Sequence, residues 1–177
     1  MEKKISGEMI YNGKIISVYK DKVECPNKRI ATREVVRHHG GVGIIASIDN
    51  KILLVKQFRY VYNEDTIEIP AGKLEQGEDT KEAALRELEE ETNYSSKEIN
   101  KVMTIYPTPG YDDEVLHIYE AKDIYEVKNP LDCDEDEFID VIFMDIEKAY
   151  HKILSGEIKD SKTIAAIQYL YINKKQI

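Results

Sequence analysis

The segment 80–92, TKEAALRELEEET, constrains this chain most, because it predicts a helix that gathers acidic side chains on one face. At about 100° per residue, Glu87, Glu90 and Glu91 share roughly 100° of the helix surface. Like charges at this spacing each destabilise an isolated helix by about 0.2–0.5 kcal/mol. A hard divalent cation bound between them would reverse the sign of that interaction, because such ions prefer oxygen ligands.

The other positions of this helix fit the same arrangement. Ala83 and Ala84 lie on or beside the acidic arc and are small enough to leave room above it, whereas Leu88 points toward a core. Arg86 is four residues before Glu90 and can orient the cluster by charge-assisted hydrogen bonds. Taken alone, the pattern is more typical of a solvated acidic helix face.

The residues before the helix favour the metal-binding interpretation. Gly72 permits a tight backbone at the end of a strand, and Gly77-Glu78 predicts a second turn, after which Asp79 or Thr80 can cap the helix. A strand, a glycine loop and an acidic helix in this order can present carboxylates and a backbone carbonyl to one metal ion.

Gly72, Glu78 and residues 86–94, RELEEETNY, together resemble the Nudix box of the Nudix hydrolases. The one departure is Asn93, where the family usually has glycine. That glycine would end the helix in a left-handed conformation, and asparagine is the next most tolerant residue there. The departure therefore concerns local stability more than chemistry.

The remaining sequence predicts an α+β fold with a mixed sheet flanked by helices. Asn12-Gly13 and Asp49-Asn50 are hairpin signals, and residues 145–154 and 161–173 have helical patterns. The resemblance implies a Nudix α/β/α sandwich. We therefore expect a small antiparallel β unit at residues 1–39, which would serve dimerisation, and a Nudix hydrolase domain at residues 40–177.

The resemblance covers nearly the whole chain and is greatest to the ADP-ribose pyrophosphatases. The segments that carry it include TREVVRHHGGVGIIA, LLVKQFRY, IEIPAGKLEQGED, YPTPGYDDE and LDCDEDEFIDV. It implies Mg²⁺-dependent hydrolysis of ADP-ribose to AMP and ribose 5-phosphate, with Mn²⁺ as an alternative cation, and a homodimer. Ile10 or Tyr11 would then be candidates for contact with adenine across the dimer interface. Two alternatives stay open: hydrolysis of another nucleotide sugar or nucleoside diphosphate derivative, and a non-catalytic nucleotide-binding module.

The resemblance also implies roles for individual residues. The metal ligands would be the Ala71 carbonyl, Glu87, Glu91 and Glu137. The catalytic residues would be Glu135 as general base, with Arg86 and Glu90. The substrate-binding residues would be Arg33, Arg59, Lys73, Gly110 and Glu114.

Each of these assignments has a structural alternative. Arg59 could pair with Glu68 or another surface acid, and Arg33, which is next to Glu34, could form a surface ion pair. The acidic run at residues 132–137 could be a solvated loop, and a slip of one or two residues would exchange the roles assigned within it.

Composition limits the other functional classes. The 177 residues carry 34 acidic and 25 basic side chains, a net charge of −9, which argues against a nucleic-acid-binding surface but not against a local basic pocket for an anion. No long apolar run or signal-peptide pattern occurs, so we expect a cytoplasmic protein without a membrane partner. The motif at residues 41–46 fits a dinucleotide-binding glycine pattern, but its β-branched residues predict a strand where that motif requires a helix.

Overall fold

The computed structural model describes residues 1–133 and 138–174, which form two compact units. One unit comprises residues 1–40 together with residues 106–116, and the other contains the remaining residues. The segment 106–116, which the sequence placed with the second domain, thus packs with the N-terminal residues.

The N-terminal unit is built on a three-stranded antiparallel sheet in the order β1-β2-β3. Its strands are β1 (Lys3–Asn12), β2 (Ile16–Glu24) and β3 (Ile30–His38). The predicted turn at Asn12-Gly13 joins the first two. Residues 106–116 extend this unit along β3, because the Val36 N–H donates to the Tyr111 carbonyl at 2.8 Å and the Asp113 N–H donates to the Val36 carbonyl at 3.2 Å.

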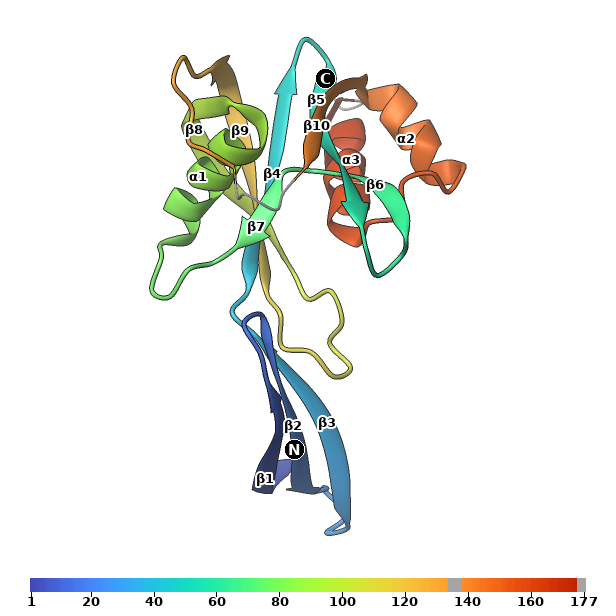
Figure 1. Cartoon of the computed structure of the whole chain (residues 1–177). Coiled ribbons are helices and arrows are strands. Elements are labelled where there is room, and N and C mark those ends of the chain that lie inside the picture. The colour runs from blue at the N-terminus through green and yellow to red at the C-terminus, as the bar shows by residue number, and fades with distance from the viewer. Residues whose placement is uncertain (134–137, 175–177) are drawn as a thin grey trace. The chain divides into compact units, whose positions relative to one another are not determined.

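The second unit contains a seven-stranded sheet with the path β10-β5-β4-β9-β8, in which β6 pairs with β5 and β7 with β4. Its strands are β4 (Gly41–Ile48), β5 (Lys51–Arg59), β6 (Glu64–Glu68), β7 (Ala71–Lys73), β8 (Tyr94–Ile105), β9 (Leu116–Glu126) and β10 (Ile139–Asp145). The helices are α1 (Thr80–Thr92), α2 (Ile146–Leu154) and α3 (Ser161–Lys174). In this unit α1 lies on one side of the sheet, and α2 and α3 lie on the other (Figure 1). The predicted fold class is confirmed.

The core between α1 and the sheet forms where apolar helix positions meet the buried strand β4. Ala83, Ala84 and Leu88 of α1 are fully buried in one cluster with Val42 and Ile44 of β4. The expectation that the two alanines leave room above the acidic face was wrong. Their small side chains instead allow the helix to pack closely on β4, and Glu87 and Glu91, which lie beside them on the helix, are buried as well.

Most of the local predictions agree with the structure. Asp49 and Asn50 adopt positive φ angles in the turn between β4 and β5, so residues 41–48 form a strand that returns as a hairpin. Asp145 caps α2 and Gly156 follows its end with a φ of 76°. Among the described residues, none of the helices is long and apolar enough to cross a membrane.

Candidate active site

The strand, loop and helix at residues 71–93 form the scaffold of the candidate site. Asp79 caps α1 by accepting hydrogen bonds from the N–H groups of Lys81 and Glu82. Asn93 ends the helix with a φ of 63°, in the left-handed conformation expected for this departure from the Nudix box. The helix therefore has defined ends, and its acidic face has a fixed rotation relative to β7.

Two carboxylates of α1 converge on the backbone of β7. Glu87 and Glu91 are both buried, with 9% and 8% of their surface exposed. The Ala71 N–H donates a hydrogen bond to Glu91 Oε2 at 2.9 Å. A Cβ atom placed on Gly72 would overlap the carboxylate of Glu87. Gly72 is therefore needed because a larger residue would displace the Glu87 carboxylate. The sequence analysis had instead expected a glycine that permits a tight backbone at the end of a strand.

Arg86 holds the surrounding acids in place. Its Nε and Nη2 donate to Glu78 at 2.8 and 3.1 Å, and its Nη1 contacts Glu90 and Glu87 at 2.7 and 2.8 Å. The hydrogen bond to Glu78 raises the pKa of Arg86 far above its ordinary value, against the effect of burial, and Glu87 and Glu90 add to that rise. The same bond lowers the pKa of Glu78. Arg86 thus stays charged and orients the acidic cluster, as its spacing predicted.

The donor atoms in this cluster fit a hard divalent cation. They include the carboxylate oxygens of Glu87 and Glu91, the type of ligand that Mg²⁺ and Mn²⁺ prefer. Within residues 1–133 and 138–174, no group of three His, Cys, Asp or Glu side chains is arranged to hold a metal ion. The further ligand and the general base expected from the sequence, Glu137 and Glu135, lie outside the described residues.

Arg59 lies at the end of β5 and is oriented by Glu68 at the end of β6. Its Nε and Nη2 donate to the two carboxylate oxygens of Glu68 at 2.7 and 2.8 Å. The structure thus contains the ion pair that the sequence left open as an alternative. The pKa of Arg59 is raised first by this hydrogen bond and also, to a smaller extent, by the charge of Glu91. The charge of Glu91 on the acidic face of α1 therefore acts on Arg59.

Sequence analysis did not identify the residues that hold Glu68. Lys162 Nζ donates to Glu68 Oε2 at 2.5 Å and also lies 3.1 Å from an oxygen of Asp160. Lys162 is 8% exposed and lies one turn before Ala166 on the buried side of α3. A lysine on the apolar face of a helix is the signal that could have predicted a buried acidic partner.

The other predicted substrate residues occupy both units. Lys73 ends β7, and its carbonyl accepts from Arg86 Nη2 at 3.3 Å. Arg33 of β3 forms a surface ion pair, as the alternative allowed, and its partner is Glu2 and not its neighbour Glu34. Gly110 lies in an open turn, and Glu114 Oε1 lies 3.6 Å from His38 Nδ1.

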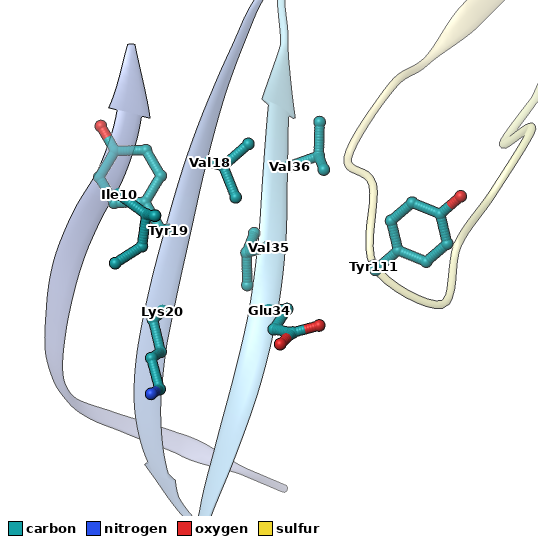
Figure 2. A pocket seen from close by; sticks show the side chains of 8 residues that line it. All are labelled: Ile10, Val18, Tyr19, Lys20, Glu34, Val35, Val36 and Tyr111. Carbon is teal, nitrogen blue, oxygen red and sulfur yellow. The ribbon is translucent and has the colours of Figure 1, made fainter.

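The N-terminal unit also contains a concavity of about 540 Å³. Figure 2 shows its lining, which is mainly apolar: Ile10, Val18, Tyr19, Lys20, Glu34, Val35, Val36 and Tyr111. Tyr111 comes from the segment 106–116, which also carries Gly110 and Glu114. The concavity is thus lined by Tyr111, the residue that directly follows Gly110.

We compared the chain with models of known protein families. Residues 37–167 match the NUDIX domain, and residues 2–36 match the nucleoside diphosphate sugar hydrolase N-terminal domain. The chain belongs to the Nudix family. The two matches meet at residues 36 and 37, close to the predicted boundary.

Individual relatives match over almost the whole chain. The ADP-ribose pyrophosphatase of Bacillus subtilis (strain 168) is 43% identical, and the methanol dehydrogenase activator of Bacillus methanolicus is 42% identical; each alignment covers 98% of this chain and 94% of the relative. A crystal structure of an ADP compounds hydrolase superimposes with a TM-score of 0.84 at 18% identity, covering 99% of this chain and 94% of that one. At 18% identity, this structural similarity shows that the two proteins share a fold.

Proposed function

We propose that this protein hydrolyses the pyrophosphate bond of ADP-ribose, giving AMP and ribose 5-phosphate, with Mg²⁺ or alternatively Mn²⁺. The observation that carries this proposal is the convergence of the buried Glu87 and Glu91 carboxylates on Ala71 and Gly72. The similarity to an ADP-ribose pyrophosphatase over 98% of the chain supports the substrate.

The chemistry of the substrate explains why this set of residues is suited to it. A diphosphate is a negatively charged electrophile that reacts slowly, so hydrolysis requires its oxygens to be neutralised and a water to be positioned. The Ala71 carbonyl, Glu87, Glu91 and Glu137 would hold the cation, which supplies charge neutralisation and acidifies a bound water. Arg86 and Glu90 keep the acidic cluster ordered, and Glu135 would accept the proton of the attacking water.

Substrate recognition would use the residues that the family resemblance implies. Arg59 can donate to phosphate oxygens through the guanidinium edge that Glu68 leaves available, and Lys73 would add positive charge. Arg33, Gly110 and Glu114 would contact the rest of the substrate. These roles follow the resemblance to the family.

We also propose that the N-terminal sheet forms a homodimer interface. Every residue of β1 is exposed, including Ile5, Met9, Ile10 and Tyr11. An exposed apolar strand of this kind favours association. Analytical ultracentrifugation is expected to give twice the mass of the 20.5 kDa chain, and a monomer at micromolar concentration would contradict the proposal.

A Nudix hydrolase acting on another nucleotide sugar is the second candidate function. The match of residues 2–36 to a nucleoside diphosphate sugar hydrolase domain favours it. A non-catalytic nucleotide-binding module is less well supported, because the carboxylates of the Nudix box are all present.

Product analysis tests the proposal directly. The protein is incubated with Mg²⁺ and either ADP-ribose or a panel of nucleotide sugars, beside Glu91→Gln and the control Glu82→Gln, which makes the same change at an exposed position of α1. Equal amounts of AMP and ribose 5-phosphate are expected from wild type and the control, and very little from Glu91→Gln. Hydrolysis in ¹⁸O-water should label AMP; label in ribose 5-phosphate would instead place the attack on the other phosphorus.

Two other results would change the conclusion. Cleavage of another nucleotide sugar but not of ADP-ribose would keep the chemistry and reject the substrate. Absence of cleavage across the whole panel would reject the hydrolase in favour of a binding module.

A further inference from the structure

A buried ionic network connects α3 with the ends of β5 and β6. At its centre is Glu68, which is 4% exposed and accepts hydrogen bonds from Arg59, Lys162 and Thr66. Burial alone would raise the pKa of Glu68, but the hydrogen bonds from Arg59, Lys162 and Thr66 and the charge of Lys162 lower it to about 2. Glu68 is therefore an anion at neutral pH, and two cations share its charge.

The two cations differ in their access to solution. The Arg59 side chain is 39% exposed, whereas the Lys162 side chain is 11% exposed and is enclosed by Glu68 and Asp160. A guanidinium has five N–H donors, of which Glu68 takes two, so three remain for another acceptor. Arg59 can thus meet a ligand directly, while Lys162 can influence a ligand only through its neighbours.

Glu68 orients Arg59, but its negative charge also reduces the attraction that Arg59 offers to an anion. Asp160 adds a second negative charge that acts on Arg59. Here Lys162 and Arg59 together balance Glu68 and Asp160. Without Lys162 the group would carry a net charge of −1, and an approaching phosphate would be repelled.

We propose that Lys162 is a positioning residue for the substrate diphosphate: by balancing Glu68 and Asp160 from within the protein, it allows Glu68 to orient Arg59 without leaving a net negative charge beside the phosphate oxygens. The inference deepens the proposed function and rests on it. It assigns to α3, which contributes no residue to the Nudix box, a part in substrate binding.

The experiment compares Lys162→Met with Lys159→Met. Lys159 forms an exposed ion pair with Glu64 of β6 at 2.9 Å. The control therefore also replaces a lysine that is paired with a glutamate of β6, but at an exposed position. We expect Lys162→Met to raise KM for ADP-ribose about tenfold with kcat changed less than about threefold, because the lost interaction serves binding in both ground and transition states. Lys159→Met should leave both parameters within about twofold, and Lys162→Arg should restore most of KM.

A double-mutant cycle with Arg59→Ala separates positioning from general destabilisation. Because Lys162 acts through Arg59, the Lys162→Met change should raise KM less than about threefold when Arg59 is already absent. Calorimetric titration with ADP-ribose in EDTA gives the same comparison as a dissociation constant, without metal or turnover. Additive effects, or a change confined to thermal stability, would overturn the proposal.

The outcome is also decisive if ADP-ribose proves not to be the substrate. In that case the cycle is run with inorganic pyrophosphate as the titrant, since it carries only the anionic part of the ligand. A loss of affinity in Lys162→Met that disappears in the Arg59→Ala background supports the charge-sharing role. Pyrophosphate binding that is equal in wild type and Lys162→Met, or absent from wild type, rejects it.

Discussion

Replacing Gly72 with alanine is expected to disable the site while leaving the fold in place. The added Cβ would overlap the carboxylate of Glu87, which must retreat by about 1.5 Å to reach an ordinary van der Waals distance. The φ of Gly72 lies outside the left-handed region, so the backbone itself accepts alanine. A misplacement of about 1 Å at a reacting centre costs about 100-fold in rate. We therefore expect kcat/KM to fall at least about 100-fold, or about 2.7 kcal/mol of transition-state stabilisation.

Gly77 is the matched control, because it belongs to the same motif but requires glycine for another reason. Its φ is 81° and a Cβ there would meet open space. Gly77→Ala should therefore lower stability by about 1–2 kcal/mol while changing kcat/KM less than about threefold. The assay is steady-state hydrolysis of ADP-ribose beside urea unfolding of each variant. If Gly72→Ala keeps kcat/KM within about threefold of wild type, the placement of Glu87 does not limit the reaction and the reasoning fails.

Three further predictions concern stability. Asn93→Gly should stabilise the protein by about 0.5 kcal/mol and Asn93→Ala should destabilise it by about 1 kcal/mol, because residue 93 has a left-handed φ; equal midpoints of urea unfolding would contradict this. Thr163→Val should cost about 1–3 kcal/mol in thermal unfolding and Thr163→Ser much less, since the buried hydroxyl accepts from the Ile69 N–H at 2.8 Å. Glu68 has a pKa lowered from 4.5 to about 2, so it contributes about 3 kcal/mol of stability above pH 4.5 that is lost as the pH falls through about 2. Glu68→Gln should accordingly show a shallower loss of stability over that pH range, and identical slopes would refute the assignment.

The parts of the site that the sequence predicted are those determined by short spacings. The extent of α1, its cap at Asp79 and its left-handed end at Asn93 depend on residues within one or two turns of one another. The contact between Arg86 and Glu90 follows from their separation of four residues. Local geometry was sufficient for these predictions, because each interaction lies within a single element.

The contacts that escaped prediction join distant segments. Lys162 lies 94 residues from Glu68, and Arg33 pairs with Glu2 across 31 residues, so neither pairing follows from a helix or strand period. The docking of residues 106–116 along β3 combines backbone hydrogen bonds with the ion pair between Arg37 and Asp113, which are 76 residues apart. The reason for Gly72 was also hidden, because it depends on where α1 lies relative to β7.

Two charge networks meet at residues 68–73, which explains how a chain with a net charge of −9 can offer a site to an anionic substrate. From α1, Arg86 neutralises Glu78, Glu87 and Glu90 in part; from α3, Lys162 neutralises Glu68. Interactions between buried charges are screened little by salt, so these local balances matter more to a ligand than the distant surface acids. Arg86 carries one positive charge among three carboxylates, so the acidic cluster near β7 stays net negative, which favours a divalent cation. Lys162 shares the charge of Glu68, which favours phosphate at Arg59. The same arrangement predicts that removing one internal cation changes ligand binding more than removing several surface acids would.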